Sequence, residues 1–166
     1  MVEKGSFTKR AVFVLAGGLG AFVVALLWGA ICVALGLASP AQMHQAAQFQ
    51  AELQDVPRYI IAHVVLSPLL ETIPFVILLW LCRKLPRGKI QIYGYLAAIF
   101  LLGWALHGAT LLSVGRGVAF AVVGLVMATS QPRRGFRAAY IDAACAHSVW
   151  NVLATLFILC VIAKGD

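Results

Sequence analysis

Polar side chains of complementary chemistry lie inside long apolar stretches of this chain: Glu71, His107, His147 and Asn151. Ionisable groups are expensive in hydrocarbon, so their presence there usually marks a function. A carboxylate can accept a proton from water, while imidazole and amide groups can stabilise a developing negative charge, and hydrolysis requires both. His147 and Asn151 are four residues apart, so a helix presents both on one face. We therefore treat these residues as candidate catalytic groups.

The stretches that carry these groups are long enough to cross a bilayer, which takes about 20 residues of helix. We predict five spans, over residues 11–38, 59–82, 92–112, 117–130 and 138–163. Of the 166 residues, 62% are hydrophobic and 11% are charged, and the mean hydropathy is +0.93. This composition excludes an ordinary soluble domain. We expect an all-α, polytopic integral membrane helical bundle that forms a single domain over residues 1–166.

Basic residues account for the net charge of +7 and fall in short clusters between the apolar stretches. The clusters comprise Lys4, Lys9 and Arg10; Arg83, Lys84, Arg87 and Lys89; and Arg133, Arg134 and Arg137. Such clusters mark the cytoplasmic side, so the N-terminus is expected in the cytoplasm and the C-terminus outside, in a bacterial inner membrane. They form no continuous basic face, which argues against a nucleic-acid partner. The first apolar stretch exceeds the roughly 7–15 residues of a signal-peptide core, so we expect it to be retained.

Residues 40–56 have a different pattern from the rest of the chain. Apolar residues recur there at helical spacing, with glutamines and a glutamate between them. This pattern is typical of a helix that lies on a membrane surface. We expect an interfacial helix on the outer leaflet, either as a cover for the bundle or as a gate for a substrate.

Two prolines flank Glu71 in the sequence SPLLETIPF, residues 67–75. Pro68 and Pro74 lack an amide hydrogen and clash with the preceding turn, which predicts a loosened helix on either side of the carboxylate. The carbonyl groups that are freed need partners, which buried polar groups or water can supply. The sequence therefore predicts a small hydrated cavity at Glu71.

Short motifs around these residues match those of a known family. His147 and Asn151 form an HxxxN motif preceded by an alanine, while Glu71 and Phe75 occupy the first glutamate and the phenylalanine of a proline-preceded EExxFRG motif. Over about residues 67–152, the chain resembles the glutamate-dependent intramembrane proteases of the CPBP group. This group includes type II CAAX prenyl endopeptidases and bacteriocin-processing proteins.

The chain also departs from the motifs of that group. Thr72 replaces the second glutamate and Val76 replaces the arginine of the first motif, and Gly103 stands at the phenylalanine of an FxxxH motif that ends at His107. The four groups that the family uses in catalysis are retained. The missing arginine removes a positive partner for the carboxylate, which argues against a typical prenyl-protein substrate.

The resemblance implies a mechanism in which Glu71 acts as general base on a water that attacks a peptide carbonyl. His107 would help to bind that water, and His147 and Asn151 would stabilise the oxyanion. One carboxylate and two histidines are also a possible zinc set, so a divalent metal held by Glu71, His107 and His147 is the alternative.

The resemblance implies an intramembrane endopeptidase that cleaves a membrane-anchored protein or peptide tail within or beside the lipid bilayer, for maturation or sorting. One rival is a non-catalytic immunity or scaffold protein of the same fold that binds a membrane partner. A second rival is a small transporter linked to protonation of Glu71. No inverted repeat of the kind found in many transporters is evident in the sequence.

Overall fold

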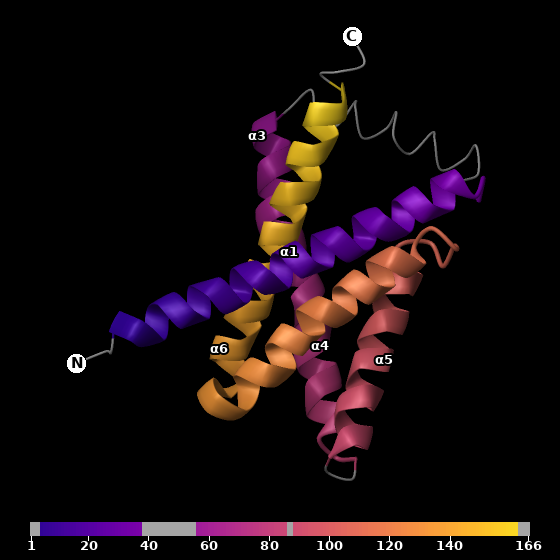
Figure 1. The fold of residues 1–166 in the computed structure, drawn as a ribbon. Helices are drawn as coiled ribbons and strands as arrows, with labels where there is room; N and C mark the ends of the chain where they lie inside the picture. Colours follow the sequence, from indigo (N-terminus) through magenta and orange to yellow (C-terminus); the bar gives the residue numbers. More distant parts are fainter. Residues whose placement is uncertain (1–3, 38–55, 86–87, 163–166) are drawn as a thin grey trace.

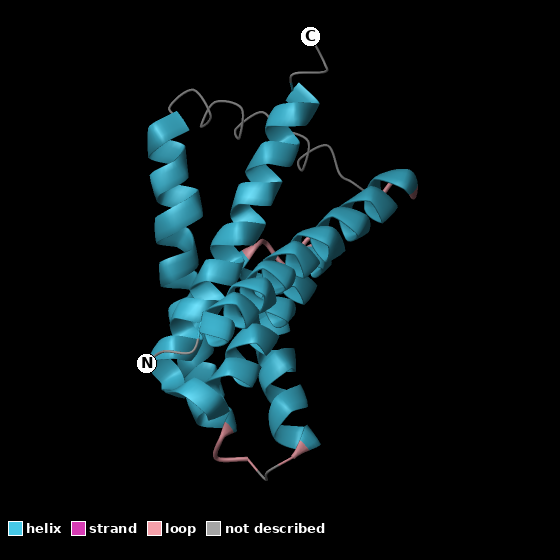
Figure 2. Ribbon diagram, turned by 60° about the vertical axis from the view of Figure 1, so that its left-hand side comes forward, coloured by secondary structure: helices cyan, strands magenta, loops and turns pink. Residues whose placement is uncertain are grey.

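The computed structural model describes residues 4–37, 56–85 and 88–162, which form helices joined by turns, with no strand among them (Figure 2). In chain order the elements are α1 (Lys4–Ala34), α3 (Val56–Tyr59), the π-helix η1 (Ile60–Leu66), α4 (Ser67–Cys82), α5 (Lys89–Leu106) and α6 (Val114–Ile162). The prediction of an all-α fold is confirmed for these residues. The predicted interfacial helix, 40–56, falls outside the described residues except for Val56.

Helices long and apolar enough to cross a membrane number four among the described residues: Phe7–Ala34, Pro57–Cys82, Lys89–Leu106 and Val114–Cys160. Large apolar side chains such as Leu70 and Trp80 are more than half exposed on the outside of the bundle. A soluble protein rarely exposes apolar surface on this scale, whereas lipid tails solvate it. The chain is therefore a helical membrane protein.

The last helix, α6, is broken at Gly135, where the backbone has φ 77° and ψ 172°. Side chains with a Cβ rarely adopt that conformation, and glycine adopts it without steric cost. Figure 1 shows the two legs of α6 running in different directions from this bend. The legs correspond to the predicted fourth and fifth spans, 117–130 and 138–163. Four helices of spanning length are present, and the division of α6 into two membrane spans stays a prediction.

The ends of the helices separate into two groups. The end of α4, the start of α5 and the bend in α6 lie at the lower end of the bundle in Figure 1, whereas α3 and the C-terminal end of α6 lie at the upper end. The basic clusters after Leu81 and around Gly135 therefore lie toward the same end. The orientation of the chain in the membrane, which was predicted from the charge bias, stays a prediction.

Helix α1 runs alongside the first leg of α6 and crosses the second leg (Figure 1), and it contacts both at close range. A Cβ at Gly17 would lie 2.5 Å from a methyl group of Val126 on the first leg, and one at Gly18 would lie 2.6 Å from the carbonyl oxygen of Ala146 on the second. Glycine at such crossings allows two backbones to approach, as is common between membrane helices. Helix α1 therefore braces the turn of α6 that carries His147.

A buried carboxylate joins α1 to the two legs of α6. Asp142 is only 1% exposed, and its Oδ1 accepts a hydrogen bond from Arg10 Nε at 2.6 Å. Its Oδ2 accepts one from Arg134 Nη1 at 2.8 Å. Because a buried charge is costly unless it is paired and hydrogen-bonded, these two arginines hold the acid in place. Asp142 thus links α1 and the two legs of α6.

Candidate active site

Glu71 and His147 face each other across the interior of the bundle. His147 Nε2 lies 3.8 Å from Glu71 Oε2, and the imidazole is 3% exposed while the carboxylate is 29% exposed. Ser67, one helical turn before Glu71, donates a hydrogen bond to the other carboxylate oxygen, Oε1. The carboxylate is therefore fixed by α4 itself. At 3.8 Å the two groups are too far apart for a direct hydrogen bond and close enough for one water molecule to contact both.

The helix that carries Glu71 begins with an irregularity that Pro68 explains. The N–H of Ser67 donates to the carbonyl of Ala62, five residues back, which is the hydrogen-bond register of a π-helix. In that register the carbonyl of His63 would receive the N–H of residue 68, and proline has none. Asn151 Nδ2 donates to this carbonyl instead, at 2.6 Å.

The prediction of two breaks around Glu71 is therefore half correct. The backbone is irregular before Pro68, in η1, but α4 continues through Pro74 as an α-helix. Next to the first proline, the Tyr140 hydroxyl donates to the carbonyl of Leu69 at 2.8 Å. Side chains of α6 thus bond two backbone oxygens on the N-terminal side of Glu71, those of His63 and Leu69, as helices with prolines in membranes require.

Phe120 is the common neighbour of the two candidate imidazoles. The centroid of its fully buried ring lies 5.4 Å from that of His107 and 5.2 Å from that of His147, edge-on in both cases. The ring packs over Gly103, where a Cβ would lie 2.6 Å from Phe120 Cγ. Gly103 is the position at which the FxxxH motif has phenylalanine. An aromatic ring therefore fills this space, but α6 supplies it instead of α5.

His107 follows the last residue of α5 and contacts a basic residue that the sequence did not single out. Arg116 Nη1 lies 3.3 Å from His107 Nδ1. Arginine only donates hydrogen bonds, so Nδ1 must accept, and the neutral ring then carries its hydrogen on Nε2. His107 Nε2 is buried and has no hydrogen-bond partner among the described residues. The contact with Arg116 therefore leaves His107 with a free donor.

The ring of His147 is held by an aromatic contact. Its ring stacks on Trp150, with centroids 5.1 Å apart and an interplanar angle of 20°. Nδ1 of His147 and the hydroxyl of Thr72 are buried and also lack hydrogen-bond partners within the described part of the chain. Unsatisfied buried polar atoms are rare in native proteins and often belong to catalytic or ligand-binding groups.

The site does not assemble the candidate zinc ligands. Among the described residues, no group of three or more histidine, cysteine, aspartate or glutamate side chains is arranged to hold a metal ion. Glu71 and His147 are neighbours, and the ring of Phe120 contacts both His107 and His147. The three side chains as arranged therefore do not fit a divalent metal.

The four predicted site residues thus lie in one region of the bundle but make different contacts. Glu71 and His147 face each other, His107 joins them across Phe120, and the amide of Asn151 is directed at a backbone carbonyl. The motifs of the sequence did not point to Arg116 or to Phe120 as parts of the site. Ser67 could have been found, because a hydroxyl four residues before a carboxylate shares its helix face.

Comparison of the chain with protein-family models, with curated proteins and with solved structures gives no match. The geometry of the site and the motifs of the sequence therefore carry the functional argument.

Proposed function

We propose that this protein is an intramembrane endopeptidase that hydrolyses a peptide bond in a membrane-anchored protein or peptide tail, with water activated by Glu71. The observation that carries the proposal is the gap of 3.8 Å between Glu71 Oε2 and His147 Nε2 in an apolar bundle. It pairs a proton acceptor with a hydrogen-bond donor at a separation that lets one water molecule contact both.

The chemistry follows from these two groups. The oxygen of the water attacks the peptide carbonyl carbon while one of its protons passes to the Glu71 carboxylate, which is partly exposed and held by Ser67. The carbonyl oxygen becomes an oxyanion, and His147 Nε2–H and the free donor of His107 supply hydrogen bonds to it. When the carbon–nitrogen bond breaks, the proton on Glu71 passes to the leaving amine.

In this proposal Asn151 has two roles, whereas the motif suggests only that it stabilises the oxyanion. One hydrogen of its amide nitrogen is used by the carbonyl of His63, so one remains for the oxyanion. The bond to His63 ties the second leg of α6 to η1. In this way Asn151 holds His147, one turn away on the same helix, in register with Glu71.

The test is a cleavage assay with the purified chain in vesicles that contain quenched fluorescent, membrane-anchored peptides. Glu71→Gln retains an oxygen that accepts from Ser67 but removes the proton acceptor, so we expect the rate to fall by about 100-fold or more. Thr129→Val is the matched control on α6, because within the described part of the chain the Thr129 hydroxyl bonds only to carbonyls of its own helix, those of Leu125 and Val126. We expect the control to cleave at the wild-type rate.

Normal cleavage by Glu71→Gln of a peptide that the wild type cleaves would refute the role of the carboxylate. A wild-type protein that binds the peptides without cleaving any of them would favour the scaffold or immunity function instead. Circular dichroism and thermal unfolding of each variant in detergent separate a catalytic loss from a loss of fold.

A further inference from the structure

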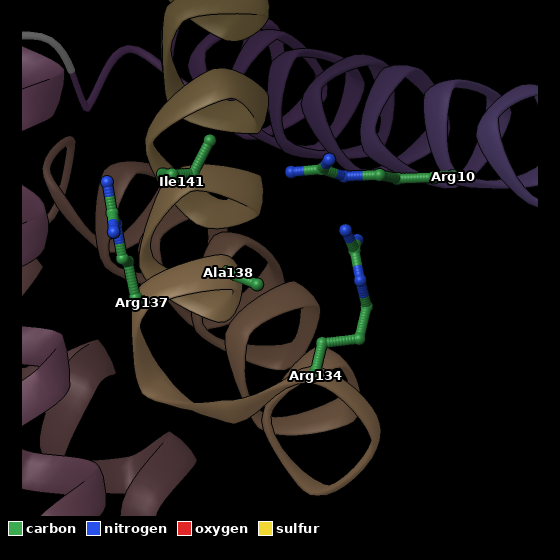
Figure 3. Close-up of a pocket in the computed structure, with 5 residues that line it drawn as sticks. All are labelled: Arg10, Arg134, Arg137, Ala138 and Ile141. Atoms are coloured by element: carbon green, nitrogen blue, oxygen red, sulfur yellow. The ribbon is translucent and has the colours of Figure 1, made fainter. Parts of the chain in front are cut away.

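An open pocket of about 350 Å³ lies between α1 and the bend of α6, away from the candidate active site. Its lining combines three arginines with two apolar side chains: Arg10, Arg134, Arg137, Ala138 and Ile141. Figure 3 shows the guanidinium groups of Arg10 and Arg134 approaching each other from α1 and α6, with Ala138 near them and Arg137 along the other side of the α6 turn. The pocket is therefore basic at its rim and apolar at its floor.

Asp142 fixes two arginines of this pocket and uses only part of their hydrogen-bond donors. It receives Nε of Arg10 and one terminal nitrogen of Arg134, so both terminal nitrogens of Arg10 and the second one of Arg134 remain to bind a ligand. Arg137 has no ion-pair partner among the described residues. Two guanidinium groups thus share one carboxylate and Arg137 adds a third positive charge, so the site keeps an excess of positive charge.

The position of the pocket favours an anion that is part of a lipid. It lies at the end of the bundle that carries the basic clusters, where α1 and α6 meet, and its apolar floor continues onto helices of membrane-spanning length. Planar, bidentate guanidinium groups are suited to phosphate oxygens. Basic pockets between transmembrane helices on the cytoplasmic side bind anionic lipid headgroups.

We propose that the pocket between α1 and the bend of α6 binds the phosphate of an anionic phospholipid headgroup. Arg10 and Arg134, ordered by Asp142, bind the phosphate oxygens. Arg137 adds charge at the rim, and Ala138 and Ile141 contact the glycerol and the first carbons of the acyl chains. The lipid thereby links α1 to both legs of α6 and stabilises the arrangement that positions His147. The proposal of a lipid site does not depend on the proposed peptidase activity.

The experiment measures lipid retained by the purified full chain after exchange into a neutral detergent, by native mass spectrometry, with phosphatidylglycerol and phosphatidylcholine as probes. We expect preferential retention of phosphatidylglycerol. Arg137→Gln should reduce that retention about fivefold, because one basic side chain near the surface contributes attraction of this size. Arg133→Gln is the matched control, since it makes the same charge change four residues earlier and outside the pocket lining.

Both substitutions are at exposed positions without ion pairs among the described residues, so the variants should fold, which thermal unfolding verifies. Equal retention of the two lipids, or equal losses for Arg137→Gln and Arg133→Gln, overturns the proposal. A third arm adds inorganic phosphate alone. If millimolar phosphate displaces the lipid and stabilises the protein to the same extent, the natural ligand is a soluble phosphate, and the assignment to a lipid is wrong.

Discussion

The contact between Gly103 and Phe120 should make a single added methyl group harmful. In Gly103→Ala the new Cβ would lie 2.6 Å from Phe120 Cγ and 2.7 Å from Phe120 Cβ. The second distance is about 0.7 Å short of the 3.4 Å at which ordinary van der Waals contact begins. A Cβ atom is fixed by its backbone, so no change of rotamer relieves this overlap. Helices α5 and α6 must move apart.

The expected cost follows from two opposing effects. Alanine is a better helix former than glycine by about 1 kcal/mol, which favours the variant. Overpacking of a filled core costs about 1–3 kcal/mol, and Phe120 is fully buried against Phe75 and Trp150 as well as both imidazoles. We expect Gly103→Ala to be about 1–3 kcal/mol less stable than a variant that gains the same helix propensity without the clash. Cleavage should fall too, because Phe120 contacts both imidazoles.

Gly94→Ala provides this comparison on the same helix. Among the described residues, its new Cβ would meet only the end of the Leu85 side chain, at 3.4 Å, so the variant should be as stable as the wild type or more stable. The assay is thermal unfolding of both variants in detergent, where about 1 kcal/mol corresponds to roughly 2–4 °C in a chain of this length. If Gly103→Ala unfolds at the same temperature as Gly94→Ala, the packing of Phe120 over Gly103 is wrong.

Two further variants test the bonds that join the helices. Asn151→Asp replaces a donor with a second acceptor opposite the His63 carbonyl, and it should lower the free energy of unfolding by about 1–3 kcal/mol in a denaturation series, whereas unchanged stability would contradict that bond. Asp142→Asn leaves Arg10 and Arg134 without a carboxylate and should cost about 1–3 kcal/mol, because both arginines are about a third exposed and partly screened. The stability difference between wild type and Asp142→Asn should shrink in 1 M salt, and a difference independent of salt would argue against an ionic origin.

The sequence predicted the features that depend on side-chain periodicity. Long apolar stretches with charged ends predicted helices near their observed positions, and the four-residue spacing of His147 and Asn151 predicted a shared helix face. The bend at Gly135 falls in the basic segment expected between the last two spans. In each case a property of neighbouring residues along one helix was sufficient.

Features that depend on contact between helices were beyond the sequence. Phe120 enters the site only because Gly103, on another helix, leaves room for its ring. Arg116 reaches His107 only because the short connection after α5 folds back, which composition does not reveal. The π-helix before Pro68 is a change of hydrogen-bond register, and such a change leaves little mark on the order of apolar and polar residues.

The bond from Asn151 to the His63 carbonyl has a consequence for how this site can be searched by mutation. The acceptor is a backbone oxygen that the π-helix and Pro68 make available, so replacing the His63 side chain leaves the acceptor in place. A scan that substitutes one residue at a time therefore reports this contact at Asn151 and at Pro68, but not at His63. Deleting one residue within Ile60–Leu66 would instead return the segment toward α-helical register and turn Glu71 relative to α3. Part of the information that builds this site is thus the number of residues before Glu71, and not their identity.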